Sequence, residues 1–329
     1  MGEFDLIARI RARAPTRADV LLGIGDDAAL LLPPAGLQLV VAMDTLNAGV
    51  HFPPATAPAD IGWKALAVNL SDLAAMGAQP AWCTLSLSMP EAQAGFVDGF
   101  LDGFLALAAQ YDVALVGGDT TRGPLSVCVA VHGLVEPGMA LRRDGARAGD
   151  EVWVSGSVGD AAAALVQWKE GCKGGQLGCP AEAQPDPLSL ALRARLDRPT
   201  PRVALGRALR GVASACIDVS DGLLADLGHV CAASGVAATV DVDALPASEA
   251  LRASFSSEHR RHLQATGGDD YELCFSAAAD AHAVVLRAAA TAAVAVTRIG
   301  RILPGAGVAA HTADTDPWSA PATGWVHFA

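Results

Sequence analysis

Apolar residues recur along the chain in two patterns, and both are clear in its first half. Apolar residues at helical spacing predict helices, whereas compact or alternating apolar runs predict strands. The helices expected on this basis are residues 3–13, 60–76 and 96–111. The expected strands are residues 37–43, 81–89, 113–116 and 125–135. Asp60 can cap the second helix, and Gly77 can end it.

A break at Pro137–Gly138 interrupts this pattern, which predicts a domain boundary between residues 1–137 and 138–329. Beyond it, the expected strands are residues 151–155, 213–219, 236–242 and 271–276. The expected helices are an alanine-rich segment after Gly159 and residues 200–210, 222–234 and 279–293. Residues 170–187 are rich in Gly, Pro and Cys, which favours a surface loop. Both halves therefore indicate an α/β fold of the mixed α+β kind.

The composition fits two folded domains with an acidic surface. The chain has 329 residues, 52% of them hydrophobic, and no apolar stretch approaches the ~20 residues of a membrane-spanning helix. The N-terminus carries Glu3 and Asp5 and lacks a secretory signal pattern. The net charge of −12 opposes binding to nucleic acid or to an anionic membrane. Seven cysteines, mostly within apolar runs, are typical of a reducing compartment, so we expect a cytoplasmic protein.

Aspartates gather at the corners where the expected strands end. Asp26 and Asp27 follow Gly23-Ile24-Gly25, and Asp44 and Asp119 are each expected to terminate an apolar strand. The other corner aspartates are Asp218, Asp221, Asp269 and Asp270. Carboxylates at strand ends of α/β folds lie where ligands usually bind. A single Asp at such a corner is more often a turn former, because Asp bonds readily to its local backbone, but five separate glycine–aspartate corners favour a binding site.

Asp72 is the acid with the most unusual predicted setting. It shares one helical stripe with Ile61, Ala65 and Val68, so its carboxylate projects from the apolar side of the helix. It also lies near the helix C-terminus, where the macrodipole disfavours negative charge. The carboxylate therefore needs a cation, which is either a distant Arg or a metal ion. Oxygen ligands without a Cys or His cluster indicate Mg²⁺ rather than Zn²⁺.

Mg²⁺ held by scattered carboxylates usually completes its shell with water and substrate phosphates, and glycine-rich turns offer backbone donors to phosphate oxygens. The residues thus favour Mg²⁺-nucleotide chemistry. Arg142 and Arg143 are candidate phosphate clamps, or they are ordinary solvated side chains. The P-loop and protein-kinase signatures are absent from the sequence.

Six ordered motifs make the chain resemble the bacterial thiamine-monophosphate kinase family over nearly its whole length. They are Gly23–Asp27, Asp44-Thr45 with His51-Phe52, Lys64–Gly77, Gly117–Pro124, Ile217–Gly222 and Gly267–Leu273. The resemblance implies transfer of the ATP γ-phosphoryl group to thiamine monophosphate, in thiamine diphosphate biosynthesis. It implies the two-domain PurM-like fold shared with aminoimidazole ribonucleotide synthetase and selenophosphate synthetase. It also implies a homodimer built on the sheet of the N-terminal domain, and a C-terminal α/β domain that completes the nucleotide and substrate site.

The resemblance also assigns roles to individual residues. It implies several Mg²⁺ ions and the metal ligands Asp27, Asp44, Asp72, Asp119, Asp218 and Asp221. It implies nucleotide contacts at Gly118, Asp119, Arg143 and Ser220, and thiamine phosphate contacts at His51, Asp269 and Trp325. In physical terms Trp325 could stack on the cationic thiazolium or be a core residue, and His51 could donate to a phosphate or cap a turn.

The chain departs from the family pattern in two places. Ala42 and Met43 stand where members often carry Ser or Thr, so no side-chain hydroxyl is available there, and a backbone carbonyl such as that of Met43 could serve as the ligand instead. Asp269-Asp270 replaces a common Glu-Asp pair, which shortens the reach towards the substrate.

The expected mechanism is direct in-line transfer to an ionised substrate phosphate, without a general base. One alternative is another ATP-dependent enzyme of the same superfamily. Selenophosphate synthetase is disfavoured because that enzyme is expected to carry a reactive cysteine near its N-terminus, whereas the first cysteine here is Cys83. Aminoimidazole ribonucleotide synthetase is disfavoured by the kinase-like segments Gly117–Pro124 and Gly267–Leu273. The other alternative is a sensor that binds Mg²⁺-nucleotide without turnover.

Overall fold

The computed structural model describes residues 2–171, 186–320 and 324–325, and it divides into two compact units. Unit 1 comprises residues 1–73 and 78–138, and unit 2 comprises residues 74–77 and 139–329. The chain passes from unit 1 to unit 2 after Gly138, one residue beyond the predicted boundary. Residues 74–77, at the end of a helix and just after it, are assigned to unit 2. Among the described residues, no helix is long and apolar enough to cross a membrane.

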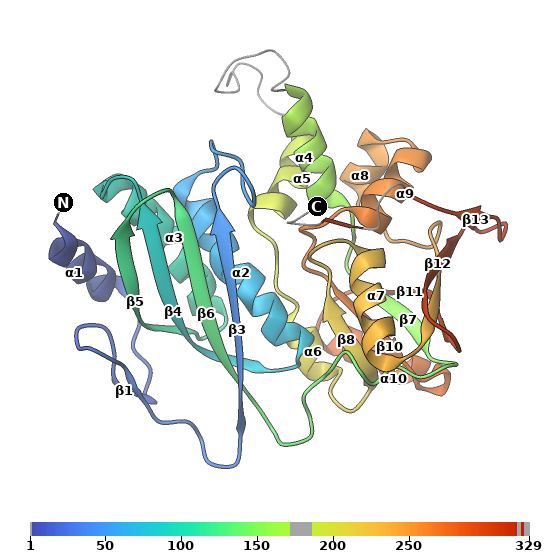
Figure 1. Ribbon diagram of the computed structural model, residues 1–329, viewed down its shortest axis with the longest axis horizontal. Helices are drawn as coiled ribbons and strands as arrows, with labels where there is room; N and C mark the ends of the chain where they lie inside the picture. Colours follow the sequence, from blue (N-terminus) through green and yellow to red (C-terminus); the bar gives the residue numbers. More distant parts are fainter. Residues whose placement is uncertain (1, 172–185, 321–323, 326–329) are drawn as a thin grey trace. The chain divides into compact units, whose positions relative to one another are not determined.

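Unit 1 contains a four-stranded sheet in the order β3-β6-β4-β5 (Figure 1). Its strands are β3 (Gln38–Asn47), β4 (Gln79–Met89), β5 (Ala114–Arg122) and β6 (Ser126–Val135). The helices are α1 (Glu3–Arg13), α2 (Pro58–Ala75) and α3 (Ala94–Gln110). Strands β4 and β5 are parallel and joined through α3, whereas β6 pairs antiparallel with both β3 and β4. The predicted helices and most strand positions are therefore confirmed, although α2 begins at Pro58 and leaves Asp60 in its first turn.

Helices α2 and α3 pack closely against each other and supply much of the core of unit 1. A Cβ atom on Gly103 of α3 would lie 1.7 Å from the carbonyl oxygen of Ala59, and one on Gly62 of α2 would lie 2.0 Å from that of Phe100. Only glycine permits this distance between helices. Phe100 and Phe104 stack at 5.8 Å between ring centroids, and both are fully buried.

The opposite face of the sheet carries exposed apolar side chains. Leu39, Val41 and Met43 alternate along β3 and are 51%, 57% and 64% exposed. The strand predicted over residues 37–43 is confirmed, and period-2 alternation places these three side chains on the face without helices. A two-stranded hairpin, β1 (Val20–Leu22) and β2 (Leu30–Leu31), packs Val20 and Leu31 against another part of the sheet.

Unit 2 is built on a seven-stranded mixed sheet in the order β13-β12-β9-β11-β7-β10-β8. Its strands are β7 (Glu151–Ser155), β8 (Ala213–Asp218), β9 (Ala237–Asp241), β10 (Leu273–Ala277), β11 (Val296–Leu303), β12 (Gly307–His311) and β13 (Pro317–Trp318). All neighbours pair antiparallel except β9 and β12, which are parallel. Strand β8 forms one edge, and it ends at Asp218, just before the turn that carries Asp221; both are predicted metal ligands.

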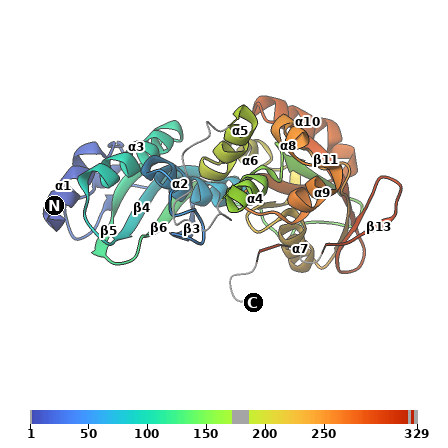
Figure 2. The same cartoon turned by 90° about the horizontal axis from the view of Figure 1, so that it is seen from above.

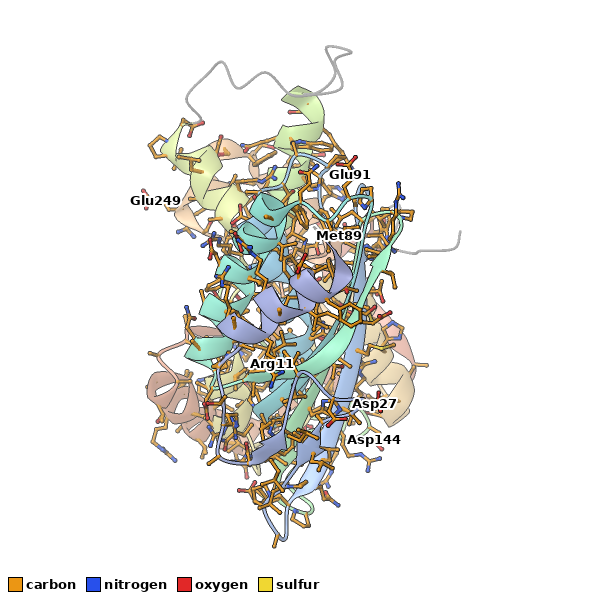
Figure 3. All side chains as sticks on the ribbon, turned by 90° about the vertical axis from the view of Figure 1, so that its left-hand side faces the viewer. Arg11, Asp27, Met89, Glu91, Asp144 and Glu249 are labelled. Carbon is orange, nitrogen blue, oxygen red and sulfur yellow. The ribbon has the colours of Figure 1, made fainter. Side chains whose placement is uncertain are left out.

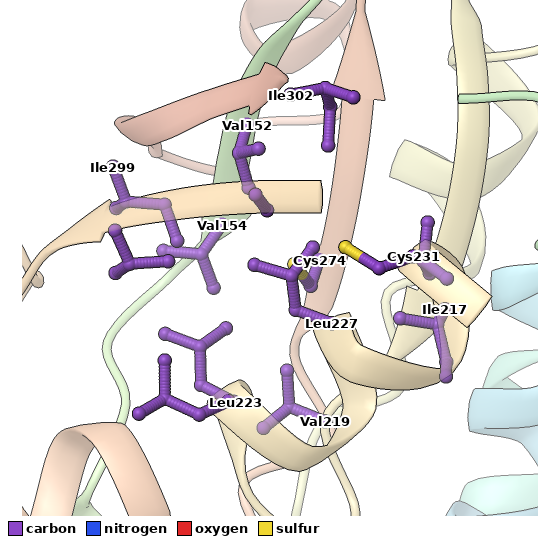
Figure 4. Close-up of a cluster of buried hydrophobic side chains, with 14 of the residues drawn as sticks. Val152, Val154, Ile217, Val219, Leu223, Leu227, Cys231, Cys274, Ile299 and Ile302 are labelled. Carbon is purple, nitrogen blue, oxygen red and sulfur yellow. The ribbon is translucent and has the colours of Figure 1, made fainter. Parts of the chain in front are cut away.

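Helices cover both faces of this sheet, as the view from above shows (Figure 2). They are α4 (Asp160–Gly171), α5 (Pro187–Asp197), α6 (Val203–Ala208), α7 (Leu223–Ser234), α8 (Glu249–Ser254), α9 (Ser257–Thr266) and α10 (His282–Thr291). On one face, Leu223 and Leu227 of α7 join Val154 and Cys274 in a buried cluster (Figure 4). On the other face, Trp153 contacts the ring of His282 in α10 at 4.8 Å between ring centroids.

Several elements of unit 2 were not expected from the apolar pattern. They are α5, α8, α9, β11, β12 and β13, and the helix predicted over residues 200–210 is only α6. Helix α8 has six residues and α9 consists mostly of polar and charged residues, so neither shows a clear apolar period. The predicted loop 170–187 falls mainly on residues 172–185, which lie outside the described residues.

Candidate active site

The turn between β8 and α7 is the centre of the predicted site in unit 2. Asp218 ends the strand and is buried, whereas Ser220 and Asp221 are half-buried in the turn itself. Gly222 then adopts φ +134°, and a Cβ there would lie 2.7 Å from the carbonyl oxygen of Thr266. The Asp-Val-Ser-Asp-Gly motif thus forms a sharp strand-to-helix corner for which glycine is required at its last position.

Asp226, one turn into α7, supports this corner from beneath. Its Oδ2 accepts the backbone N–H groups of Ser220, Asp221 and Gly222 at 3.0, 3.1 and 3.1 Å. Burial raises the pKa of its carboxyl to about 7, the negative charge of Asp218 acts in the same direction, and these N–H bonds oppose the shift. Sequence reasoning missed this residue, although an acid in the apolar run Leu223–Val230 was a visible signal.

The same turn holds the predicted substrate contacts of unit 2. The N–H of Asp269 donates to the Ser220 carbonyl at 2.8 Å, and the N–H of Trp325 donates to the Asp221 carbonyl at 2.9 Å. Asp269 and Tyr271 have φ values of +69° and +51°, and the Tyr271 hydroxyl donates to the Asp269 carboxylate. The structure therefore brings Ser220, Asp221, Asp269 and Trp325 together. The Trp325 side chain is 56% exposed, so the alternative of a core tryptophan is excluded.

A buried charge cluster lies behind the Gly267–Leu273 motif. The Glu272 side chain is fully buried and accepts from Ser155 Oγ, from Arg195 at 2.7 Å, and from Nε and one terminal nitrogen of Arg202 at 2.6 and 2.5 Å. Asp270 is also buried, and its Oδ2 accepts the Gly159 N–H at 2.6 Å. Burial raises the pKa of Asp270 well above its usual range, although the Gly159 bond acts against this shift. These groups brace the motif, and no local sequence pattern identified Arg195 or Arg202 as their partners.

The two candidate phosphate clamps lie beside β8. The Arg142 carbonyl accepts the N–H of Cys216, and the Arg143 carbonyl accepts the Ser234 hydroxyl, which fixes this segment along the edge strand. The guanidinium of Arg142 pairs with Asp144, with Nε 2.8 Å from Oδ1, and this pair raises the pKa of Arg142. The structure thus gives Arg142 an ion-pair partner, and the exposed Arg143 stays the predicted nucleotide contact.

In unit 1, buried polar groups of α2 hold the segments that carry the predicted ligands. The Asn69 side-chain oxygen accepts the N–H of Asp44 at 2.9 Å. The ammonium of Lys64, 2% exposed, donates to the His51 carbonyl at 2.9 Å. His51 Nδ1 in turn accepts the N–H of Asn47, as the turn-capping alternative requires, and its contact with thiamine phosphate stays a prediction. Sequence reasoning recognised the Lys64–Gly77 motif without assigning roles to Lys64 and Asn69.

The strand register separates Asp44 from Asp119 within unit 1. Both lie inside strands rather than at strand ends, because β3 continues to Asn47 and β5 to Arg122. Asp44 of β3 pairs with Val129 of β6, which pairs in turn with Leu85 of β4. Asp119 of β5 aligns with Ser86, the next residue of β4, so the two aspartates lie one residue apart in register across the sheet. Strands β3 and β5 are the two edges of the sheet, so three strand spacings, about 14 Å along the sheet, lie between them.

The remaining predicted ligands of unit 1 are solvent-accessible to different degrees. Asp27 is exposed in the turn after β1 (Figure 3). The guanidinium of Arg11 lies against Gly25 of the same turn. Ile61, Ala65 and Val68 are buried as predicted, but Asp72 at the end of their stripe is only half-buried. Gly118 is exposed with φ +147°, and its Cβ position is filled by the Leu85 carbonyl.

The donor set fits Mg²⁺ in its chemistry. Asp27, Asp44 and Asp119 present carboxylate oxygens to solvent, which is what an ion that keeps water and phosphate ligands requires. In the described part of the chain, no three His, Cys, Asp or Glu side chains form a ready metal cage. Four of the six predicted aspartate ligands belong to unit 1 and two to unit 2, and their assignment stays a prediction.

Comparison with known proteins shows which class of protein has this fold. The N-terminal domain of AIR synthase related proteins matches residues 25–135, and their C-terminal domain matches residues 147–312. The two units, with a four-stranded sheet in one and a seven-stranded sheet in the other, thus have the two-domain PurM-like fold of that class.

Similar proteins identify the family within this class. Thiamine-monophosphate kinase of Salmonella typhimurium is 49% identical over 84% of this chain and 82% of its own length. A crystal structure of thiamine-monophosphate kinase from Stenotrophomonas maltophilia K279a is 58% identical, has a TM-score of 0.86 and covers 94% of this chain and 96% of its own. A structure of AaThiL complexed with AMPPCP and TMP is 31% identical, has a TM-score of 0.76 and covers 99% and 97% of the two chains. The chain belongs to the thiamine-monophosphate kinase family.

Proposed function

We propose that this chain transfers the γ-phosphoryl group of ATP to thiamine monophosphate and so forms thiamine diphosphate. The observation that carries the proposal is the single turn after β8, which joins a predicted metal ligand and nucleotide contact to Asp269 and Trp325 through hydrogen bonds. Relatives named thiamine-monophosphate kinase, and the AaThiL complex with an ATP analogue and TMP, support the same reaction.

Mg²⁺, in several copies, is the metal that we propose for this site. Asp27, Asp44, Asp72 and Asp119 of unit 1, with Asp218 and Asp221 of unit 2, would hold it, together with the Met43 carbonyl. When bound, it would neutralise the crowded phosphates and polarise the transferred group. The acidic net charge is then compatible with two anionic substrates, because the cations supply the positive field.

The chain's own groups position the reactants. The proposed nucleotide contacts are the backbone of Gly118 and the side chains of Asp119, Arg143 and Ser220. His51, Asp269 and Trp325 are the proposed contacts with thiamine monophosphate. The Asp269 carboxylate and the exposed aromatic ring of Trp325 both favour the positive charge of the thiazolium. The nucleophile is a phosphate oxygen that is already ionised, so no side chain is assigned as a general base.

We also propose a homodimer joined through the β3 side of unit 1. The exposed row Leu39, Val41 and Met43 forms an apolar surface of the kind that marks protein interfaces. Asp44 and Asp119 lie on opposite edges of one sheet, so a second copy, meeting this sheet edge to edge, would bring such carboxylates together. The cysteines that the structure describes are all free thiols, which supports a reducing, cytoplasmic location.

Incubation of the purified protein with Mg²⁺-ATP and thiamine monophosphate tests the proposal. We expect thiamine diphosphate and ADP in equal amounts by chromatography. No product should form when EDTA removes the Mg²⁺ or when thiamine replaces thiamine monophosphate. The substrates of aminoimidazole ribonucleotide synthetase and of selenophosphate synthetase are tested in the same assay as controls for the superfamily alternative, and we expect no turnover of either. Calorimetric binding of ATP without any turnover would instead support the nucleotide-sensor alternative.

A further inference from the structure

We infer that Asp226 is a positioning residue that holds the nucleotide side and the thiamine phosphate side of the site in one fixed arrangement. The inference rests on the proposed function and concerns the turn Ser220–Gly222, which we call the shared turn. Asp226 is 2% exposed and lies beneath this turn, so it acts through the backbone of the turn rather than on a substrate.

One oxygen atom sets the orientation of the shared turn. Oδ2 of Asp226 accepts three consecutive backbone N–H groups at 3.0 to 3.1 Å. Hydrogen bonds to a carboxylate are strong and directional, and only one placement of the turn satisfies three of them at once. The helix itself fixes the acceptor, because the N–H of Asp226 bonds to the Gly222 carbonyl at 2.9 Å.

The carbonyl groups of the same turn carry the substrate contacts. The Ser220 carbonyl accepts the N–H of Asp269, and the Asp221 carbonyl accepts the N–H of Trp325. The N–H groups of the shared turn therefore bond to Asp226, and its carbonyls bond to the segments that bear the proposed thiamine phosphate contacts. A displacement of the turn would move Ser220, Asp221, Asp269 and Trp325 together.

Two glycines pack closely against the carbonyl groups of the shared turn. A Cβ on Gly268 would lie 2.4 Å from the Ser220 carbonyl oxygen, and one on Gly324 would lie 2.8 Å from the Asp221 carbonyl oxygen. The turn is thus enclosed between Asp226 on one side and two closely packed glycine segments on the other. An acceptor that is displaced or shortened must disturb both substrate contacts.

Two substitutions separate the position of the oxygen from its charge. Asp226→Asn keeps the length of the side chain and a carbonyl acceptor but removes the charge. Asp226→Glu keeps the charge but moves the acceptor by one methylene. Asp243→Glu is the matched control, because Asp243 accepts the N–H of Ala313 at 3.0 Å elsewhere in unit 2. Asp226→Ser, whose hydroxyl is too short to reach all three N–H groups, replaces the Glu variant if that variant does not fold.

The test is steady-state kinetics with each substrate varied, after circular dichroism has confirmed folding. We expect Asp226→Glu, or Asp226→Ser, to raise the KM for ATP and the KM for thiamine monophosphate by roughly tenfold or more. Asp226→Asn should keep both values within about threefold, and Asp243→Glu should leave them unchanged.

Three results would overturn the inference: unchanged KM values in Asp226→Glu or Asp226→Ser, a rise for one substrate only, or a larger loss in Asp226→Asn than in Asp226→Glu. The last result would mean that charge, not position, is what the site uses. A wild-type enzyme that forms no thiamine diphosphate would contradict the proposed function itself, which keeps the two failures distinct.

Discussion

At the scale of single residues, Asp72 is a carboxylate whose place on its helix fits a binding role, which stays a prediction. It follows a stripe of buried apolar residues and lies in the last turn of α2, where negative charge opposes the helix dipole. Asp60 is also half-buried, but in the first turn of the same helix, where the dipole favours it. Helix α2 thus carries two acids in different settings, with Asp72 as a proposed ligand and Asp60 as an acid that stabilises the helix.

Asp72→Asn should lower the rate of thiamine diphosphate formation by roughly 100-fold or more, because a direct metal ligand contributes at least as much as an outer partner. Its melting temperature should stay near that of the wild type. Asp60→Asn should keep most activity and lose about 0.5 kcal/mol of stability. Kinetics and thermal unfolding of both variants check this, and full activity of Asp72→Asn would remove Asp72 from the ligand set.

Asp226 should also leave a signature in the pH dependence of stability. Its folded pKa of about 7 is higher than that of an unfolded Asp, so the folded state binds a proton more tightly. This contribution is complete below the unfolded pKa and is lost as pH rises through about 7. Between pH 5 and pH 8 the wild type should lose on the order of 3 kcal/mol that Asp226→Asn does not lose. Urea unfolding of both proteins in EDTA at the two pH values measures the difference, and parallel pH curves would contradict it.

At the scale of elements, the close approach of α2 and α3 determines where Lys64, Asn69 and Asp72 are presented. Gly103 lies directly on the Ala59 carbonyl, whereas Gly95, in the first turn of α3, has nothing within 4 Å of its Cβ position. Gly95 and Gly103, two of the glycines of α3, thus have different reasons for being there. One is required by packing, and the other is tolerated at an open surface.

Gly103→Ala should destabilise the protein by about 3 kcal/mol or more, because the helices must separate to admit a methyl group. Gly95→Ala should be neutral or stabilise by up to about 1 kcal/mol through helix propensity. Chemical denaturation of the two variants gives the comparison. Equal unfolding free energies would show that the two helices are not in such close contact.

At the scale of the whole molecule, the exposed row on β3 is the feature that an isolated unit 1 does not explain. Val41→Glu places a charge in the middle of that row, and we expect it to convert a dimer into a monomer. Leu286→Glu is the control, since Leu286 is 45% exposed on α10 of unit 2 and belongs to no such row. Sedimentation velocity distinguishes the two outcomes, and a monomeric wild type would contradict the dimer.

Local sequence determined much of this protein. Helical periodicity placed α1, α2, α3 and α7, and the Gly-Asp and Asp-Gly corners marked the segments that bear the predicted ligands, because turn chemistry and helix period act over a few residues. The six motifs were enough to indicate the family that the comparisons then showed.

Only the tertiary structure decided which of these residues are neighbours. It placed Asp44 and Asp119 on opposite edges of one sheet, and it brought Asp269 and Trp325 to the turn after β8. It also showed that Asp226 and Glu272 are buried at the centre of hydrogen-bond clusters. Strand order and burial arise from pairing between segments far apart in the chain, and no local pattern records which distant segment will be the partner.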